Sequence, residues 1–202
     1  MRAAEPRVGL MQNRKIVITG EIASGKSTVS KFIRKCGYPV FDADFWAKKI
    51  MESPEISGEI FEKFGISYGT KEFKAEMFKN EELRDFVDKV VYKRLYTFFS
   101  SVGGKLVFFE IPLYFESIGA ARKSKFIPDG VLYVSASKNI RHRRMRRVRM
   151  MTKSEILERE KYFLDANFKE NMSDYVIKND DDMEALIKNT RKFLDEKIKK
   201  AD

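Results

Sequence analysis

The sequence is poor in cysteine and histidine, with one of each among 202 residues, and it has no long apolar run. A single cysteine, Cys36, cannot form an internal disulfide, and its place at the end of an apolar helical pattern predicts a buried thiol. No stretch approaches the roughly 18 to 20 apolar residues that span a bilayer. Residues 1–14 lack the apolar region and the cleavage site of a secretion signal, so we expect a flexible N-terminal extension. These absences argue against a membrane-spanning or secreted protein and predict a cytoplasmic one.

The charge balance is basic, with 40 Lys and Arg residues against 30 Asp and Glu, a net charge of +10. Hydrophobic residues make up 43% of the chain, which is typical of a globular protein with a core and not of a disordered one. The positive charge favours an anionic partner. Phosphorylated small molecules and nucleic acids both qualify.

The stretch GEIASGKST matches the pattern G-x-x-x-x-G-K-[ST], whose fixed places are Gly20, Gly25, Lys26 and Ser27. A β-branched apolar run over residues 15–19 precedes it, and helical spacing over residues 28–35 follows, which is the context that a phosphate loop requires. Glycines in such a loop let backbone N–H groups surround phosphate oxygens at a helix N-terminus. The lysine then reaches the β- and γ-phosphates, and the serine hydroxyl ligates Mg²⁺. The sequence therefore predicts a site for ATP or a similar nucleoside triphosphate.

Short apolar runs that alternate with helical patterns predict an α/β protein of three layers, with a five-stranded parallel sheet of the P-loop type. The expected strands are residues 15–19, 38–41, 106–109, 131–134 and 175–177. The helical pattern over residues 45–102 is too long for a crossover connection and predicts a lobe beside the sheet, interrupted by a loop at residues 65–69. We expect a nucleotide-binding core of residues 15–44, 103–135 and 172–202, and a lid of residues 136–171.

Acidic residues follow two of the expected strands. Because ligands gather at the carboxyl ends of parallel strands, Asp42 is expected to be functional, whereas Asp44 is either a second functional acid or the cap of a helix that starts near Phe45. Glu110 ends the third strand. Its carboxylate either holds the Mg²⁺ shell through water or ties two loops together in an ion pair.

Residues 141–149 contain six arginines on an expected helix. This cluster has three interpretations, namely a solvated helical face, a nucleic-acid patch, and a lid that closes over transferring phosphates. The repulsion among so many like charges argues against a solvated face, and the lid is favoured because phosphoryl transfer needs such cations. Arg143 and Arg147 are four residues apart and share a face, as a phosphate clamp needs. His142 is expected to lie on the lid surface and not to act as a catalyst.

The order of these motifs resembles the dephospho-CoA kinase family from about Lys15 to Leu194. The motifs that carry the resemblance are the phosphate loop, Asp-Ala-Asp at 42–44, Pro-Leu-Tyr-Phe-Glu at 112–116, Arg-x-x-x-Arg at 143–147 and Ser-Asp-Tyr-Val-Ile-x-Asn at 173–179. This resemblance implies ATP-dependent phosphorylation of the ribose 3′-hydroxyl of dephospho-CoA, the last step of coenzyme A synthesis.

The resemblance also implies roles for individual residues. Asp42 would be the general base, Arg143 and Arg147 the lid arginines, and Asn179 a neighbour of the adenine. The phosphates of ATP would be bound by Gly20, Ala23, Ser24, Gly25, Lys26, Ser27 and Thr28, with Lys26 also acting in catalysis and Ser27 and Glu110 on the metal.

Five residues, at four places in the chain, depart from the family pattern. Glu21 replaces a glycine and is expected to put a carboxylate beside the phosphates, and Glu110 replaces an aspartate. Val91-Tyr92 stands for His-Pro in the helical lobe, and Phe163 for a glutamine after the lid. These departures concern mainly the acceptor side.

Two other functions are compatible with parts of the sequence. A kinase for shikimate or nucleoside monophosphates would share the phosphate loop and the strand-end acids, but the motifs at 112–116 and 173–179 argue against it. A nucleic-acid-binding protein would explain the arginine cluster, but the chain lacks any recognised nucleic-acid module.

Overall fold

The computed structural model describes residues 13–161 and 163–198 and contains a five-stranded parallel sheet with the strand order β2-β3-β1-β4-β5. The strands are β1 (Arg14–Thr19), β2 (Val40–Asp42), β3 (Leu106–Glu110), β4 (Gly130–Ser135) and β5 (Tyr175–Lys178). The predicted α/β fold with five parallel strands is therefore confirmed. Residues 1–12 of the expected N-terminal extension lie outside the described residues, whereas Arg14 already belongs to β1. The strand order places β1, and with it the phosphate loop, at the centre of the sheet.

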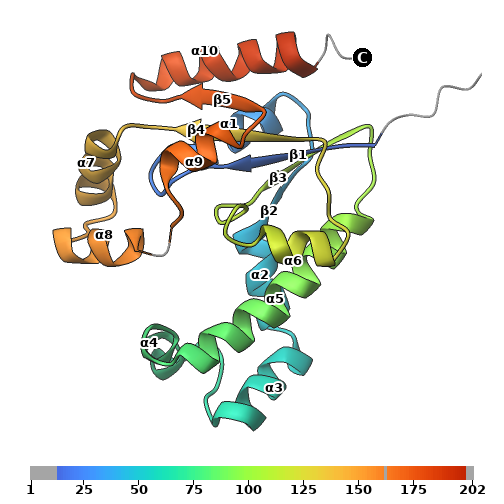
Figure 1. Cartoon of the computed structure of the whole chain (residues 1–202), viewed down its shortest axis with the longest axis vertical. Coiled ribbons are helices and arrows are strands. Elements are labelled where there is room, and N and C mark those ends of the chain that lie inside the picture. The colour runs from blue at the N-terminus through green and yellow to red at the C-terminus, as the bar shows by residue number, and fades with distance from the viewer. Residues whose placement is uncertain (1–12, 162, 199–202) are drawn as a thin grey trace, which may run out of the picture.

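Helices connect the strands and cover both faces of the sheet (Figure 1). Figure 1 shows α1 and α10 on one face, α5 and α6 on the other, and α7 and α8 beyond the end to which the strand arrows point. Within the described ranges, no helix combines the length and the apolarity that crossing a membrane would need. The helices are α1 (Lys26–Lys35), α2 (Ala43–Met51), α3 (Pro54–Phe64), α4 (Lys71–Lys79), α5 (Glu81–Ser101), α6 (Ile118–Lys123), α7 (Lys138–Val148), α8 (Lys153–Glu160), α9 (Ala166–Asn171) and α10 (Met183–Phe193), and a π-helical turn (Leu194–Ile198) follows α10.

Alternation along β1 divides the core into two layers. Ile16 and Ile18 are buried in a cluster with α1 and α10, while Val17 between them is buried in a cluster with α5 and α6. Successive side chains of a strand point to opposite faces, so a run that is apolar throughout requires cover on both sides. This pattern holds the loop after β1 between two packed layers.

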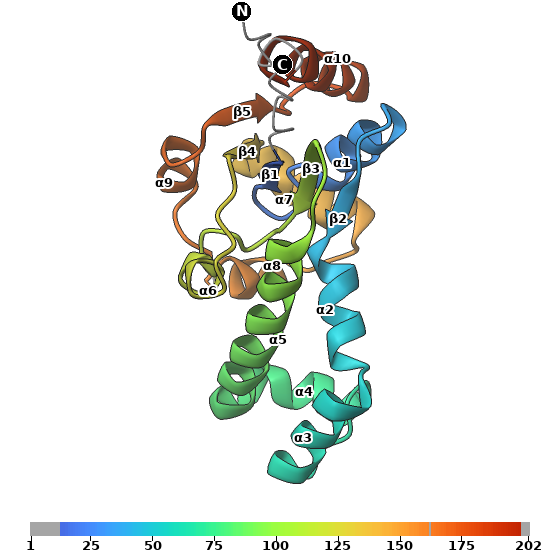
Figure 2. The same cartoon turned by 90° about the vertical axis from the view of Figure 1, so that its right-hand side faces the viewer.

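The helices α2 to α5 form a lobe that projects from one side of the sheet (Figure 2). Helix α5 belongs to two cores, because Leu83, Val87 and Val91 pack in the lobe while Leu95 and Phe99 pack against the sheet. The predicted break is confirmed, since α3 ends at Phe64 and the following residues up to 70 are not helical. One continuous helix thus joins the lobe rigidly to the sheet.

Two local predictions are wrong. Cys36 is exposed, because it caps the C-terminus of α1 beyond Ile33, the last buried residue of that helix. Helix α2 begins at Ala43 and not near Phe45, because the residue before it supplies a side-chain cap. Both errors lie at helix ends, whose exact position the hydrophobic pattern does not determine.

Candidate active site

The loop between β1 and α1 has a conformation and a packing that exclude larger residues at two positions. Gly20 has a φ of 146° and Gly25 a φ of 104°, values that L side chains rarely adopt. A Cβ atom on Gly20 would lie 2.3 Å from the carbonyl oxygen of Val134, and one on Gly25 would lie 2.3 Å from Nδ2 of Asn179. The loop is therefore packed directly against the ends of β4 and β5.

A cavity of about 400 Å³ lies beside this loop and the first turn of α1. The end of α7 and the start of α10 form its other walls. The lining residues are Ala23, Gly25, Lys26, Ser27, Thr28, Arg144, Val148, Arg149, Asn179, Met183 and Leu186. The N-terminus of α1 and three basic side chains thus face one volume, which suits an anion with several phosphate groups.

Lys26 is buried, with 8% of its surface exposed, and its ammonium group donates to the carbonyl oxygens of Gly20 at 2.7 Å and Glu21 at 3.0 Å. Burial lowers the pKa of Lys26 to about 8, although the charges of Glu110, Glu21 and Asp44 act to raise it. A cation with reduced hydration, held by two carbonyl groups, is ready to bind an entering phosphate.

Ser27 and Glu110 meet as the predicted metal-binding pair requires. The hydroxyl of Ser27 donates to Oε1 of Glu110 at 2.8 Å. Glu110 is buried at the end of β3, beside β1 and β2. One hydroxyl and one carboxylate at this separation suit Mg²⁺, which in such sites takes most of its ligands from phosphates and water. The same bond joins the first turn of α1 to the end of β3, so Glu110 also has a structural contact, although this contact is a hydrogen bond and not the ion pair of the second interpretation.

Asp42 caps helix α2. Its Oδ1 accepts hydrogen bonds from the backbone N–H of Asp44 at 2.9 Å and of Phe45 at 3.2 Å. The helix cap, one of the two roles considered for Asp44, is therefore filled by Asp42, and Oδ1 of the carboxylate predicted as the general base binds the helix N-terminus.

Asp44 lies in the first turn of α2 and near the phosphate loop. Asp44 is exposed as a residue, but partial loss of hydration at its carboxyl, and then the charges of Asp42 and Glu110, raise the pKa of that carboxyl. The charges of Lys26 and Arg149 lower it, which places Asp44 within electrostatic reach of both cations. Of the two aspartates, Asp44 has the carboxylate that is not committed to a cap and that senses the basic groups of the cavity.

The lid arginines that line the cavity differ from those predicted. Arg143 and Arg147 are exposed, and neither lines the cavity. Arg144 and Arg149 do line it. Arg144 donates to the carbonyl oxygen of Asn179 at 3.1 Å and to its side-chain oxygen at 3.2 Å. The choice of Arg143 and Arg147 as the phosphate clamp is thus not supported by their placement.

Asn179 lies beside the phosphate loop, where the sequence predicted a nucleotide contact. It is buried, and its Nδ2 donates to the carbonyl oxygen of Ser24 at 2.6 Å while its Oδ1 accepts from Arg144. Both ends of the amide are therefore engaged in holding the loop to the lid helix. A contact of Asn179 with adenine remains a prediction.

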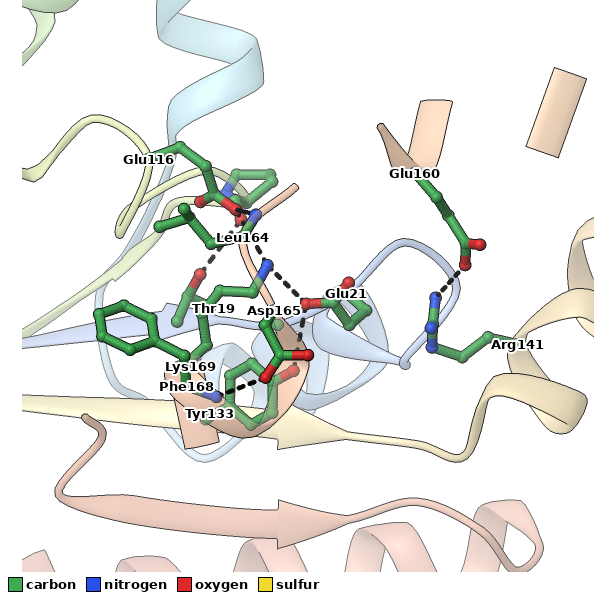
Figure 3. A network of polar contacts seen from close by, with 12 residues as sticks. Thr19, Glu21, Glu116, Tyr133, Arg141, Glu160, Leu164, Asp165, Phe168 and Lys169 are labelled. Atoms are coloured by element: carbon green, nitrogen blue, oxygen red, sulfur yellow. Dashed lines mark hydrogen bonds and ion pairs between the residues drawn. The ribbon is translucent and has the colours of Figure 1, made fainter. Parts of the chain in front are cut away.

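Glu21 does not present its carboxylate to the phosphates, contrary to expectation (Figure 3). Its side chain is buried, its Oε1 lies 2.5 Å from the ammonium of Lys169, and the hydroxyl of Tyr133 donates to the same oxygen at 3.1 Å. Lys169 also donates to Oε1 of Glu116 at 2.9 Å. We call these four residues the buried ion cluster.

The departures at Val91, Tyr92 and Phe163 have different surroundings. Val91 is part of the lobe core, while burial raises the pKa of Tyr92, as do the carboxylates of Asp88, Glu116 and Asp44. Tyr92 therefore lies on the side of α5 that faces the strand ends. The ring of Phe163 lies 5.1 Å from the ammonium of Lys169, in cation–π range.

His142 is half-buried within the lid and not on its surface. Its Nε2 lies 3.0 Å from Oε1 of Glu160, which also pairs with Arg141 at 3.2 Å. Burial acts to raise the pKa of Glu160, but His142, Arg141 and Lys138 outweigh it and lower that pKa. These contacts join α7 to α8, so His142 contributes to the structure of the lid.

Comparison with known proteins gives the family. A sequence model of dephospho-CoA kinase matches residues 14–185. The dephospho-CoA kinase of Listeria monocytogenes serovar 1/2a is 30% identical over 202 residues, which cover 92% of this chain and 98% of the relative. That of Bdellovibrio bacteriovorus is 30% identical, with 89% of this chain and 94% of the relative covered.

Solved structures agree in fold. TT1252 from Thermus thermophilus has a TM-score of 0.75 and 29% identity, with 91% of this chain and 97% of that chain covered. Shikimate kinase from Acinetobacter baumannii has a TM-score of 0.54 at 15% identity, with 94% and 96% covered, and shares the fold alone. The match to the dephospho-CoA kinase model and to the relatives of that family covers most of the chain, whereas the likeness to shikimate kinase is one of fold. The chain belongs to the dephospho-CoA kinase family.

Proposed function

We infer that this protein transfers the γ-phosphoryl group of ATP to the ribose 3′-hydroxyl of dephospho-CoA, giving coenzyme A and ADP. The observation that carries the mechanism is the placement of Lys26 and Ser27 at the start of α1 with Glu110 bound to Ser27 from the end of β3. Asp44 lies within electrostatic reach of Lys26. Phosphoryl transfer depends mainly on positioning and on the stabilisation of negative charge, and these groups supply both.

The phosphate loop would hold the β- and γ-phosphates of ATP. Backbone N–H groups of residues 23–28 and the positive end of α1 favour the phosphate charges, and Lys26 neutralises charge on the transferring oxygens. Ser27 and Glu110 would hold Mg²⁺. A metal ion held by these two residues would supply positive charge that offsets the charge of the phosphates.

Asp44 is the group that we propose as general base. A ribose hydroxyl is a weak nucleophile until it loses its proton, and a carboxylate with a raised pKa is suited to accept that proton. Asp44 meets this description, whereas Asp42 binds two backbone N–H groups of α2. Asp42 would act indirectly, because its cap fixes the first turn that carries Asp44.

The helical lobe and the lid would bind different substrates. Residues 45–102 would receive the pantetheine-bearing acceptor, with Tyr92 and Asp88 on the side that faces the strand ends. Residues 136–171 would close over ATP, with Arg144 and Arg149 directed to the cavity. The acceptor hydroxyl would then lie between Asp44 and the γ-phosphate.

A parallel assay of acceptors tests this function. Purified protein is incubated with ATP, Mg²⁺ and either dephospho-CoA, shikimate or a nucleoside monophosphate, and ADP release is followed. We expect turnover with dephospho-CoA that exceeds the other rates at least about a hundredfold, because specificity depends on contacts along the whole acceptor. Equal or greater turnover with shikimate or a nucleoside monophosphate would reject the assignment.

The lowered pKa of Lys26 predicts a pH dependence. Lys26 must be charged to bind phosphate, and in the free protein it loses its proton as the pH rises through about 8. We therefore expect kcat/KM for ATP to fall above pH 8, while kcat declines only at higher pH because bound phosphate stabilises the ammonium. Steady-state kinetics across this range check it, and a kcat/KM that stays level through roughly pH 9.5 would contradict it.

The placement of the lid arginines predicts unequal effects of two neighbouring substitutions. Arg144→Ala removes a cation of the cavity and its bonds to Asn179, so kcat/KM for ATP should fall roughly tenfold to a hundredfold. Arg143→Ala is the matched control. Because Arg143 is an exposed surface charge, its removal should change kcat/KM for ATP by less than about threefold. If Arg143→Ala lowered kcat/KM for ATP more than Arg144→Ala, the result would support the phosphate clamp of Arg143 and Arg147 that the sequence predicted.

A further inference from the structure

The buried ion cluster raises a question that the proposed reaction does not answer, namely why a phosphate loop carries the carboxylate of Glu21. Lys26 and Glu21 interact through charge, since Glu21 acts to raise the pKa of Lys26. A free carboxylate in this loop would repel the phosphates and compete with them for the ammonium of Lys26. The structure avoids this, because Glu21 is 5% exposed and its carboxylate is engaged elsewhere.

Lys169 forms the ion pair with the Glu21 carboxylate. Lys169 lies in α9, is 1% exposed, and its ammonium is 2.5 Å from Oε1 of Glu21 and 2.9 Å from Oε1 of Glu116 (Figure 3). Tyr133 donates to the same oxygen of Glu21. A buried ammonium with two carboxylates keeps its charge compensated if either partner is lost, but removal of the ammonium leaves two buried carboxylates without a cation.

The backbone of Glu21 links this cluster to the phosphate site. The carbonyl oxygen of Glu21 accepts a hydrogen bond from the ammonium of Lys26 at 3.0 Å, beside that of Gly20 at 2.7 Å. The side chain of Glu21 is thus held by Lys169 while its main chain holds Lys26. A Glu21 carboxylate released from Lys169 would therefore lie close to the ammonium of Lys26, which has to bind phosphate.

We propose that Lys169 is a positioning residue for ATP binding: it holds the Glu21 carboxylate, which would otherwise compete with phosphate for Lys26, away from the phosphates. The inference rests on the proposed function only in taking ATP as the ligand of the loop. A second consequence is that Glu21 is tolerated in the loop because Lys169 is present.

A double-mutant cycle on ATP binding tests the proposal. The affinity for ATP·Mg²⁺ is measured by titration calorimetry in the full chain, without acceptor, for Lys169→Met, Glu21→Ala and the double variant. We expect Lys169→Met to weaken ATP binding roughly tenfold to a hundredfold, because it frees a buried charge next to Lys26. Glu21→Ala should change the affinity by less than about threefold, since Lys169 keeps Glu116 as its partner.

The double variant is decisive. If Lys169 acts through Glu21, removing the carboxylate removes the competitor, and Glu21→Ala/Lys169→Met should bind ATP within about threefold of Glu21→Ala alone. If Lys169 merely stabilises the fold, the double variant will bind no better than Lys169→Met, and the proposal is rejected. Lys161→Met, which removes an exposed lysine of the same segment paired with Glu158, is the matched control and should bind as the wild type does.

The cycle remains informative if Lys169→Met does not fold. Lys169→Met also removes the cation that pairs with Glu116, so Glu116→Gln is then added. The triple variant Glu21→Ala/Glu116→Gln/Lys169→Met must fold and bind ATP within about threefold of Glu116→Gln alone, and weaker binding would overturn the proposal. Wild-type protein that binds ATP but does not phosphorylate dephospho-CoA would reject the proposed function and leave this test intact. The two inferences can therefore fail separately.

Discussion

Lys26→Ala should reduce kcat at least about a hundredfold while the protein remains folded. Lys26 is the buried cation of the phosphate loop, and two carbonyl groups hold its ammonium in place. Removing one preorganised group that stabilises charge on the transferring oxygens costs on the order of 3 kcal/mol or more. The substitution removes the ammonium from a buried site, and the avoided cost of burying that charge offsets the loss of its two hydrogen bonds. The effect on the free energy of unfolding should therefore be smaller than the effect on the activation free energy of the reaction.

The control for this variant is Lys31→Ala on the exposed side of the same helix. It removes the same charge from α1 and should alter kcat by less than about threefold. Thermal unfolding of both variants separates lost catalysis from lost stability. A Lys26→Ala protein with near wild-type kcat would show that the loop does not bind the transferring phosphate.

Asp44→Asn should lose roughly a hundredfold or more in kcat while its affinity for ATP changes little. Asparagine keeps the shape of the side chain but cannot accept the proton of the ribose hydroxyl, and general base catalysis is worth about this factor. The charges of Lys26 and Arg149 act on the Asp44 carboxyl, so it lies within electrostatic reach of two cations that line the cavity.

The comparison with Asp42→Asn decides which aspartate is the base. The amide oxygen of asparagine also caps helices well, so Asp42→Asn should keep the bonds to the N–H groups of Asp44 and Phe45 and most of the activity. Asp42→Ala should instead cost about 1 kcal/mol in the free energy of unfolding. A loss of kcat in Asp42→Asn that exceeds the loss in Asp44→Asn would return the role of base to Asp42, as the sequence predicted.

The sheet and the phosphate loop could be predicted because their signals are local. Strands buried on both faces are continuous apolar runs, and the glycines at 20 and 25 are required by backbone geometry and close packing. The strand-end position of Glu110 followed from the same pattern, and its bond to Ser27 is the contact expected of a shared metal site.

Side-chain direction in the lid could not be predicted, because the arginines leave no apolar stripe to phase the helix. Arg141 and Met145 are the buried residues of α7, and they set the inner face on which Arg144 approaches the cavity. Likewise, the direction of Glu21 depends on Lys169, which is far along the chain and has no motif of its own. The cap at Asp42 depends on two hydrogen bonds to one side-chain oxygen, which propensity does not resolve.

The position of the transferred phosphate tests the central claim most directly. Wild-type protein is incubated with ATP, Mg²⁺ and dephospho-CoA, and the product is identified by phosphorus NMR and by comparison with authentic coenzyme A. We predict a single product with the new phosphate on the ribose 3′-hydroxyl, formed in step with ADP and absent with Lys26→Ala. A product phosphorylated elsewhere, or ATP hydrolysis without phosphorylation of the acceptor, would contradict the account.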